Sequence, residues 1–449
     1  MKHLFSRLSP AQKIILSFLL VIFCGSLLLS LPWVQTASSQ AGYLDHLFTA
    51  VSMVCVTGLF TRSVVDTYNV WGQLLCMLLI QIGGLGILTF IGFFTMESRK
   101  KLSLKDRRIL RDSFSYGHNR TLGQFVRSIF ITTFTIEGLG ALLLMIRFIP
   151  KFGLGKGIFN SIFLAVSAFC NAGFDNFGND SLLGLQTDVL VNITLALLII
   201  TGGLGFMVWF DLATKLGEKQ KGLHFHTKVV LLLTAGLLVF GTVMSLWTEY
   251  NNPGTIGNLS FGDKLLVSFF QTVSMRTAGF ASIDYTAARP VTLFIYLLQM
   301  FLGGAPGGTA GGLKITTFLV LLLFARKEIL SLPHTNMGRR TLAPQLVQKA
   351  FGVTVIFQMT FLLGLLALGL VTDSSHRFIY LIFETVSALA TVGVTANITT
   401  SLNTAGMVVI MLLMFIGRVG PLTLMVSLNH YQPKKATTLH YSKADIMIG

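Results

Sequence analysis

The sequence predicts an all-α integral membrane fold of four repeats, each with two spanning helices and a re-entrant helix between them. Three observations support this fold class. Of the 449 residues, 53% are apolar and only 12% are charged, whereas soluble domains carry about 25% charged residues. Eight long apolar runs follow one another along the chain, and a short segment ending near a glycine recurs four times between them. The eight spans and four re-entrant segments would share pseudo-four-fold symmetry.

The charge and cysteine content exclude other classes. The chain has 34 Lys and Arg against 18 Asp and Glu, a net charge of +16, which on a soluble protein would suggest nucleic-acid binding. Here the basic residues are concentrated in short segments between apolar runs, so we interpret them as topology signals and expect no nucleic-acid partner. The four cysteines lie in apolar surroundings and lack the CxxC spacing of a metal site: Cys24, Cys55, Cys76 and Cys170.

The first apolar run, from Ile14 to Trp33, is 20 residues long. A secretory signal has an apolar region of about 7–15 residues, whereas about 20 residues cross a bilayer. We therefore interpret this run as the first spanning helix and not as a cleaved signal. The other seven expected spans cover residues 70–95, 125–149, 187–213, 229–248, 291–325, 347–371 and 403–428.

A recurring segment separates the two spans of each pair. All four copies contain Val-Ser five or six residues before a landmark glycine, and these glycines are spaced 115, 106 and 114 residues apart: Gly58, Gly173, Gly279 and Gly393. Each segment is too short to cross the membrane, so an extracellular amphipathic loop, a surface helix and a re-entrant pore helix are the alternatives. The recurrence favours the pore helix, whose following backbone must be buried or line an aqueous cavity.

These features divide the chain into repeats and cytoplasmic segments. The expected repeats cover residues 1–98, 124–213, 229–325 and 347–430. The expected linkers and tail cover residues 99–123, 214–228, 326–346 and 431–449.

The turns after the short segments have the composition of an ion filter. Glycine permits left-handed dihedrals and close backbone approach, and rings of carbonyl oxygens replace the hydration shell of potassium in channels whose filters contain Thr-Val-Gly. Two of the turns read Val56-Thr-Gly58 and Thr391-Val-Gly393. The candidate ion-binding residues are Val56, Thr57, Gly58, Leu59, Asn171, Ala172, Gly173, Phe174, Thr277, Ala278, Gly279, Phe280, Thr391, Val392, Gly393 and Val394.

The chain resembles the Trk/Ktr/HKT superfamily of potassium transporters over essentially its whole length, in particular the membrane subunit of bacterial Ktr systems, of the KtrB/KtrD type. The resemblance implies that the landmark glycines belong to a selectivity filter around a single pore. Sodium-selective plant relatives typically carry Ser at the first of these positions, so Gly58 implies potassium selectivity. The resemblance rests on the four glycine segments and on Ile80-Gln-Ile-Gly-Gly-Leu-Gly86, Phe301-Leu-Gly-Gly, Ala310-Gly-Gly-Leu-Lys314 and Phe415-Ile-Gly-Arg-Val-Gly-Pro421.

The resemblance also implies the assembly. Two chains would form a homodimer with two pores in a bacterial plasma membrane, in contact with membrane lipids. A separate cytosolic ring of RCK-type subunits, which bind nucleotide, would dock on the inner face. The chain itself would hold no cofactor: potassium is the substrate, and sodium is a candidate activator. The charged segment 97–123 is a candidate contact for the ring, with anionic lipid as the alternative.

A segment rich in Gly and Pro interrupts the apolar run from Val291 to Phe324. Helix interiors penalise Gly by about 1 kcal/mol and Pro by about 3 kcal/mol, so we expect a break there. A phosphate-binding loop needs Gly-Lys-Ser/Thr, an order that this segment lacks. A loop below the filter would instead be a movable barrier, and the resemblance implies the same role. The candidate gate comprises Gly303, Gly304, Ala305, Pro306, Gly307, Gly308, Thr309, Ala310, Gly311, Gly312, Lys314 and Arg418.

Arg418 lies in the middle of the last apolar run, where an arginine costs at least about 2.5–3.5 kcal/mol. Its charge could pair with a buried acid, Glu137 or Glu384, or bond helix carbonyls. A functional role is favoured because intramembrane charges are usually functional, and carbonyls of the gate loop would bind the guanidinium when the pore is closed. Lys314 is interpreted as snorkelling toward the cytoplasm, and Arg276 as anchoring the third pore helix from behind.

The second helix of each repeat carries a glycine motif that starts 24 to 29 residues after the landmark glycine. Small residues let membrane helices approach closely, and for the first two copies we weigh this packing role equally with a functional one. The motifs are Gly83-Gly-Leu-Gly86, Gly202-Gly-Leu-Gly205, Gly303-Gly-Ala-Pro-Gly307 and Gly417-Arg-Val-Gly420.

The basic residues predict the orientation. Half of the 34 Lys and Arg lie in the three linkers, against six in the segments that flank the pore helices. The positive-inside rule therefore places both termini and all three linkers in the cytoplasm, with the filter open to the outside. His224 and His226, in an inside linker, are a weak metal signal, and a solvated loop is the favoured interpretation.

The expected function is transport and not catalysis, because the chain has no nucleophile elbow, HExxH or Walker motif. Inward movement of one monovalent cation releases about 2.3 kcal/mol per 100 mV, so potassium uptake through a channel-like pore needs no ATP hydrolysis by this chain. A sodium- or proton-coupled symporter is the alternative, with Glu137, Asp211 and Glu384 as candidate titratable sites. A structural or receptor-like membrane protein would leave the four filter-like turns unexplained.

Overall fold

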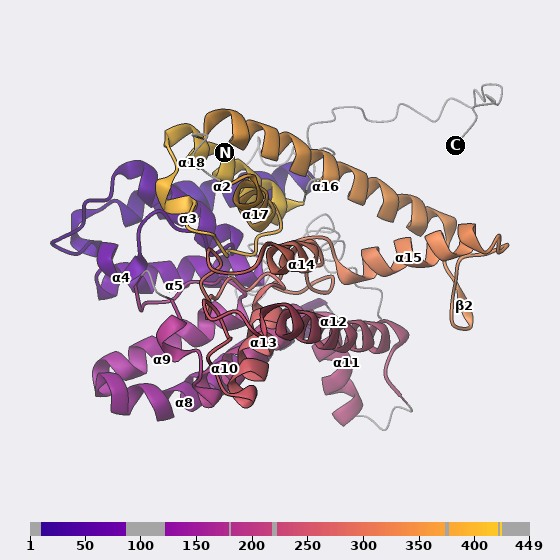
Figure 1. The fold of residues 1–449 in the computed structure, drawn as a ribbon, viewed down its shortest axis with the longest axis horizontal. Helices are drawn as coiled ribbons and strands as arrows, with labels where there is room; N and C mark the ends of the chain where they lie inside the picture. The colour runs from indigo at the N-terminus through magenta and orange to yellow at the C-terminus, as the bar shows by residue number, and fades with distance from the viewer. Residues whose placement is uncertain are drawn as a thin grey trace.

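The computed structural model describes residues 10–86, 122–178, 181–217, 222–372, 377–420 and 423, and this part of the chain is mainly helical (Figure 1). Its helices form four consecutive groups, each with a long helix, a short helix and a second helix. The elements of the first group are α2 (Pro10–Leu29), η1 (Pro32–Val34), α3 (Tyr43–Cys55), α4 (Val64–Thr67) and α5 (Val70–Leu85).

The next three groups follow the same order of a long helix, a short helix and a second helix. The second group contains α8 (Leu122–Phe152), α9 (Leu154–Phe169), η2 (Leu183–Leu185), α10 (Val189–Gly203) and α11 (Phe206–Gly217). The third contains α12 (Phe225–Glu249), α13 (Phe261–Ser274), α14 (Pro290–Phe301), α15 (Ile315–Ile329), β1 (Asn336–Met337) and β2 (Arg340–Thr341). The fourth contains α16 (Pro344–Val371), α17 (Phe378–Leu389), η3 (Thr399–Ser401) and α18 (Thr404–Val419).

The groups close into a ring. Within each group, the short helix packs against the long helix that precedes it: α3 on α2, α9 on α8, α13 on α12 and α17 on α16. Between groups, the second helix of one group packs against the short helix of the next: α5 on α9, α10 on α13, α14 on α17 and α18 on α3. Because α18 returns to α3, the fourth group is joined to the first, and the short helices lie inside the ring.

The first helices of the groups suit a bilayer. Four helices of the described residues are long and apolar enough to cross a membrane: Ala11–Leu29, Phe125–Phe152, Phe225–Glu249 and Pro344–Val371. The described second helices contain 16 residues in α5, 15 in α10, 12 in α14 and 16 in α18. Residues 87–95, 421–422 and 424–428 of two expected spans lie outside the described residues, as do most of the 97–123 segment and the tail 431–449.

A glycine with a positive φ angle follows three of the second helices. Gly86, Gly205 and Gly420 have φ angles of +83°, +88° and +90°, and glycine alone reaches this region without steric cost. At Gly205 the chain turns by 95° between α10 and α11, a bend that the continuous run 187–213 did not predict. In the third group, residues 302–314 separate α14 from α15, where the Gly and Pro content predicts a break.

Two elements extend away from the ring. In Figure 1, α15 and α16 run side by side to one end of the molecule, where the hairpin of β1 and β2 joins them. The guanidinium of Arg340 lies over the ring of Phe225, 4.6 Å from its centroid. The expected linker 326–346 is therefore held against the start of α12.

Candidate functional site

Each short helix ends in a turn with the same strained backbone. The first residue of each turn is left-handed although it is not glycine: Val56 (φ 56°), Asn171 (58°), Thr277 (64°) and Thr391 (51°). The glycine two residues later is left-handed as well: Gly58 (104°), Gly173 (71°), Gly279 (82°) and Gly393 (96°). A left-handed L-residue costs about 1–2 kcal/mol, so four equivalent copies indicate a required geometry. We call residues 56–59, 171–174, 277–280 and 391–394 the glycine turns.

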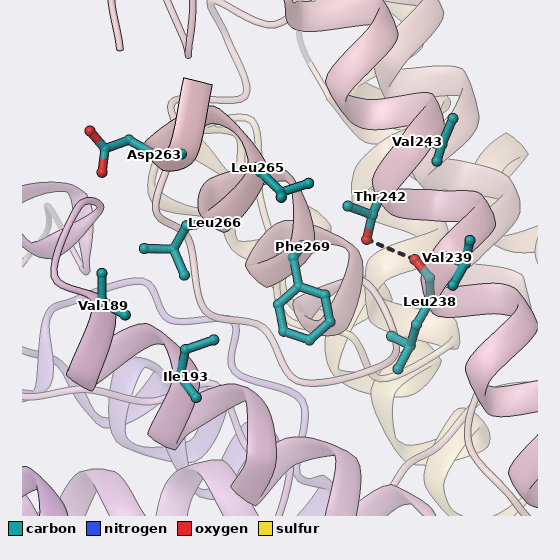
Figure 2. Close-up of a pocket in the computed structure, with 11 residues that line it drawn as sticks. Val189, Ile193, Leu238, Val239, Thr242, Val243, Asp263, Leu265, Leu266 and Phe269 are labelled. Atoms are coloured by element: carbon teal, nitrogen blue, oxygen red, sulfur yellow. Dashed lines mark hydrogen bonds between the residues drawn. The ribbon is translucent and has the colours of Figure 1, made fainter. Parts of the chain in front are cut away.

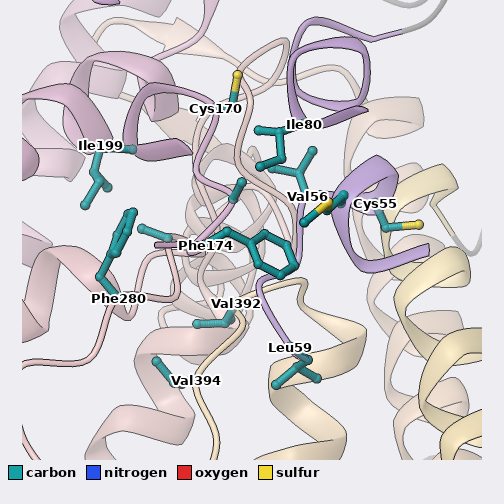
Figure 3. Packing of buried hydrophobic residues seen from close by; sticks show 14 of the residues in the cluster. Cys55, Val56, Leu59, Ile80, Cys170, Phe174, Ile199, Phe280, Val392 and Val394 are labelled. Carbon is teal, nitrogen blue, oxygen red and sulfur yellow. The ribbon is translucent and has the colours of Figure 1, made fainter. Parts of the chain in front are cut away.

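The four glycine turns meet at one place in the centre of the ring. Figure 3 shows Val56, Phe174, Phe280 and Val392, one from each turn, gathered in a single region. Each landmark glycine lies against a carbonyl oxygen of the next turn, namely that of the residue just before its glycine. The glycine of the fourth turn lies in the same way against the first turn. A Cβ atom would lie 2.7 Å from Ala172 O at Gly58, 2.7 Å from Ala278 O at Gly173, 2.6 Å from Val392 O at Gly279 and 1.9 Å from Thr57 O at Gly393.

A serine of each short helix braces the turn that follows. These are the serines of the recurring Val-Ser pair. The sequence analysis assigned them no role, although their recurrence in all four segments indicated that they have one. Three of them accept a hydrogen bond from a turn amide, and the fourth donates one to a turn carbonyl. The bonds are Gly58 N to Ser52 Oγ (3.2 Å), Phe174 N to Ser167 Oγ (3.0 Å), Gly393 N to Ser387 Oγ (3.0 Å) and Ser274 Oγ to Phe280 O (2.5 Å).

Replacing one brace should loosen one turn without unfolding the chain. Ser167→Ala removes the acceptor of Phe174 N, and a typical hydrogen bond contributes about 1 kcal/mol, which corresponds to about fivefold. We expect the ratio of rubidium to sodium flux to fall by about that factor. The matched control is Ser30→Ala, because Ser30 Oγ bonds only Leu27 O in an exposed position. Equal flux ratios for the two variants would contradict the bracing role.

The segment 302–314, which we call the glycine-rich loop, is bonded to the bend between α10 and α11. Ala305 N donates to Gly203 O (2.9 Å), Thr309 N donates to Gly202 O (3.2 Å), and Phe206 N donates to Gly307 O (3.0 Å). Breaks in two second helices therefore satisfy each other's backbone groups, which a membrane interior requires. This partnership joins residues about one repeat apart, and the sequence reasoning missed it.

The glycine-rich loop also lies directly against the glycine turns. Gly311 N donates to Thr277 Oγ1 (3.1 Å), and Thr309 Oγ1 lies 3.3 Å from the side-chain amide of Asn171. A Cβ on Gly311 would lie only 1.9 Å from Thr391 Oγ1. The loop is therefore in contact with the first residue of three turns, at the end where the short helices finish.

Two cationic side chains bind the carbonyls of the glycine-rich loop. Arg418 donates from Nη1 to Thr309 O and from Nη2 to Gly83 O and Gly84 O. It bonds carbonyls, so neither acid considered as its partner is paired with it. Lys314 donates from Nζ to Ala310 O (2.6 Å). Lys314 therefore folds back onto the loop and does not snorkel away, because it precedes α15 and the loop carbonyls are within reach.

The other titratable candidates have partners of their own. Glu384 accepts bonds from Thr395 and Thr399, which follow the fourth glycine turn. Asp211 is bonded to His224, whose Nδ1 is thereby engaged. In the described part of the chain, no group of three His, Cys, Asp or Glu side chains is arranged to hold a metal ion. Arg276 is 8% exposed and precedes the third turn, and its anchoring role stays a prediction.

The first glycine of three second-helix motifs packs against the end of a short helix. A Cβ would lie 2.3 Å from Val54 O at Gly83, 1.9 Å from Phe169 O at Gly202 and 2.0 Å from Leu389 O at Gly417. Each of these carbonyls lies two residues before a glycine turn. Close packing, which the sequence weighs for the first two motifs, therefore accounts for Gly83 and Gly202, and Gly417 of the fourth motif makes the same contact.

Comparisons with known proteins agree with one another. The family model described as TrkH, cation transport protein, matches residues 7–438. The chain is 38% identical to Ktr system potassium uptake protein B of Bacillus subtilis, over 99% of this chain and 97% of that one. It is also 38% identical to the potassium/sodium uptake protein NtpJ of Enterococcus hirae, over 100% of this chain and 99% of that one.

A solved structure shares the fold. The crystal structure of the potassium transporter TrkH from Vibrio parahaemolyticus superposes with a TM-score of 0.72 and 16% identity, covering 93% of this chain and 84% of that one. Apolar helices long enough to cross a bilayer agree with a multi-pass membrane protein. With a family match over almost its whole length and relatives of the same length, the chain belongs to the TrkH family of cation transport proteins.

Proposed function

We propose that this protein takes up potassium across the plasma membrane through one pore, with the four glycine turns as its selectivity filter. The observation that carries the proposal is the meeting of four left-handed turns in a closed ring. Backbone oxygens from four such turns provide the hard, uncharged ligands that replace the water around potassium. The short helices α3, α9, α13 and α17 are then the pore helices.

The hydroxyl groups of the turns support the same function. Thr57 Oγ1 and Thr391 Oγ1 are buried and have no hydrogen-bond partner among the described residues. Buried polar groups are nearly always satisfied, so such oxygens at the ring are suited to contact a passing cation. Gly58 in the first turn favours potassium over sodium, because a side chain there would press on Ala172 O.

The gate in this proposal is the glycine-rich loop. The loop lies against three turns, and Arg418 and Lys314 hold its carbonyls at Thr309 and Ala310. Arg418 also bonds α5 through Gly83, so it connects the loop to the first group. Opening the pore requires these bonds to break, and a cytosolic partner would bias that change.

The names of the relatives support a partner subunit. Two relatives are named Ktr system potassium uptake proteins B and D, and a system implies further subunits. We propose a homodimer with a cytosolic nucleotide-binding ring of the RCK type, both termini in the cytoplasm, and uptake driven by the membrane potential. The relative named for potassium and sodium favours sodium as the alternative cargo or activator.

Isotopic rubidium uptake in cells that lack their own potassium uptake tests this function. Cells that express the chain should accumulate rubidium, and excess potassium should suppress the uptake more strongly than excess sodium. A well-expressed protein that supports sodium uptake alone, or no cation uptake with its partner present, would contradict the proposal.

A further inference from the structure

A membrane-facing cavity lies outside the pore, between α5, α8 and α9. Its volume is about 500 Å³, within the range of small-molecule sites. Its walls are apolar, and several wall residues face outward from the ring: Leu78 is 52% exposed and Phe134 is 58% exposed. The cavity is therefore open to the lipid side of the helices.

Two buried polar side chains line this apolar cavity. Glu137 is 5% exposed and Gln81 is 7% exposed. Gln81 Nε2 donates to one carboxylate oxygen of Glu137 (3.2 Å), and Cys170 Sγ lies 3.9 Å from the other. A carboxylate accepts about four hydrogen bonds, and both of these neighbours are neutral. No cationic side chain is among the lining residues, and a buried carboxylate is costly unless a counter-charge pairs with it.

The next interface of the ring contains an equivalent cavity without this acid. It lies between α10, α12 and α13 and has a volume of about 670 Å³. Figure 2 shows its apolar walls, with Leu266 and Phe269 on α13, while Asp263 lies at the beginning of that helix. Asp263 already accepts a bond from Ser260 in an exposed position. The scaffold therefore does not require a buried acid here, and Glu137 distinguishes the first cavity.

We propose that the cavity between α5, α8 and α9 binds an amphiphilic primary amine. The ammonium group pairs with the Glu137 carboxylate, and the alkyl chain lies along Leu78 and Phe134. An ammonium carries three donors, which match the acceptor positions that Gln81 leaves open, and the apolar walls match the chain. A neutral lipid chain offers no partner for the carboxylate.

Such a ligand would act on the second glycine turn. Cys170 directly precedes Asn171, and its Sγ is 3.5 Å from Gln81 Oε1. A Cβ on Gly84 would lie 2.6 Å from the same sulfur, so Cys170 is tightly held. An ammonium that draws Glu137 and Gln81 into new bonds withdraws their contacts from Cys170. Occupancy of the cavity therefore changes the contacts of the residue that directly precedes the second glycine turn.

Binding of dodecylamine to the purified full-length protein in detergent, measured by native mass spectrometry, tests the proposal without relying on transport. We expect wild type to bind the amine at least about tenfold more tightly than 1-dodecanol, since loss of one buried charge pair exceeds 1.4 kcal/mol. Glu137→Gln should abolish that difference. Gly138→Phe should block binding, because a Cβ on Gly138 has no neighbour within 4 Å and its ring would fill the cavity.

The control is Val243→Phe, which fills the second cavity and should leave amine binding unchanged. Equal affinity for the amine and the alcohol in wild type would overturn the proposal, as would unchanged amine binding in Gly138→Phe. Thermal unfolding midpoints show which variants are folded. If Glu137→Gln does not fold, the comparison of dodecylamine with 1-dodecanol in wild type still tests the proposal. The result is independent of whether the pore carries potassium.

Discussion

Gly393→Ala should reduce rubidium uptake to less than a tenth of the wild-type rate. The residue has a φ angle of +96°, which costs an alanine about 1–2 kcal/mol. The added methyl would lie 1.9 Å from Thr57 O, and this atom is backbone, so no rotation of a side chain relieves the overlap. The first and fourth turns must separate, and the filter loses its closed ring. Uptake into cells of matched expression measures the effect.

Gly369→Ala provides the matched control. Gly369 lies within α16 and a Cβ there meets nothing within 4 Å, so alanine should be tolerated and should favour the helix by about 1 kcal/mol. We expect wild-type uptake from this variant.

Gly58→Ser should also stay folded and lose preference for potassium over sodium, because its methylene would press on Ala172 O. Wild-type uptake and selectivity in Gly393→Ala would show that the four turns are not a functional ring.

Shortening the glycine-rich loop should raise potassium flux and weaken its dependence on a cytosolic partner. Deletion of residues 307–311 removes Thr309 and Gly311, which contact the glycine turns, and the loop carbonyls held by Arg418 and Lys314. We expect at least a severalfold higher rubidium flux without the partner. Flux into proteoliposomes, normalised to the amount of protein inserted, measures the effect.

Arg418→Gln tests the side chain that holds the glycine-rich loop, without shortening the loop itself. Glutamine keeps some hydrogen bonding but removes the charge that bonds Thr309 O and Gly83 O, so flux without the partner should rise, by less than in the deletion. A conservative Arg418→Lys variant should stay nearer to wild type, since its ammonium still donates to carbonyls. If the shortened loop is well inserted yet conducts no faster than wild type, the loop is not the barrier.

Much of the site was predictable because its signals are local. The Val-Ser and glycine recurrence predicted four equivalent turns, since a turn that needs left-handed dihedrals selects glycine at a fixed distance from the helix end. The cluster from Gly303 to Gly312 predicted a break for the same reason. Arg418 in an apolar run predicted a need for nearby acceptors, and loop carbonyls were among those considered.

The features that were missed depend on contacts between distant parts of the chain. Arg418 and Gly83 are 335 residues apart, so no pattern along the sequence identifies α5 as the second partner of the guanidinium. The 95° bend after α10 is stabilised by the glycine-rich loop about one repeat later. Hydropathy alone predicted one span over residues 187–213, because both sides of the bend are apolar.

The central claim is that four glycine turns form one potassium-selective pore, and a bi-ionic reversal potential tests it most directly. The full-length protein and the variant lacking residues 307–311 are placed in planar bilayers with potassium on one side and sodium on the other. We predict current in symmetric potassium without any sodium or pH gradient. With potassium on one side and sodium on the other, we predict a reversal potential of the sign that selectivity for potassium gives, and this potential should move toward zero in Gly58→Ser. Current that requires a sodium or proton gradient, or a reversal potential near zero for both proteins, would contradict the account.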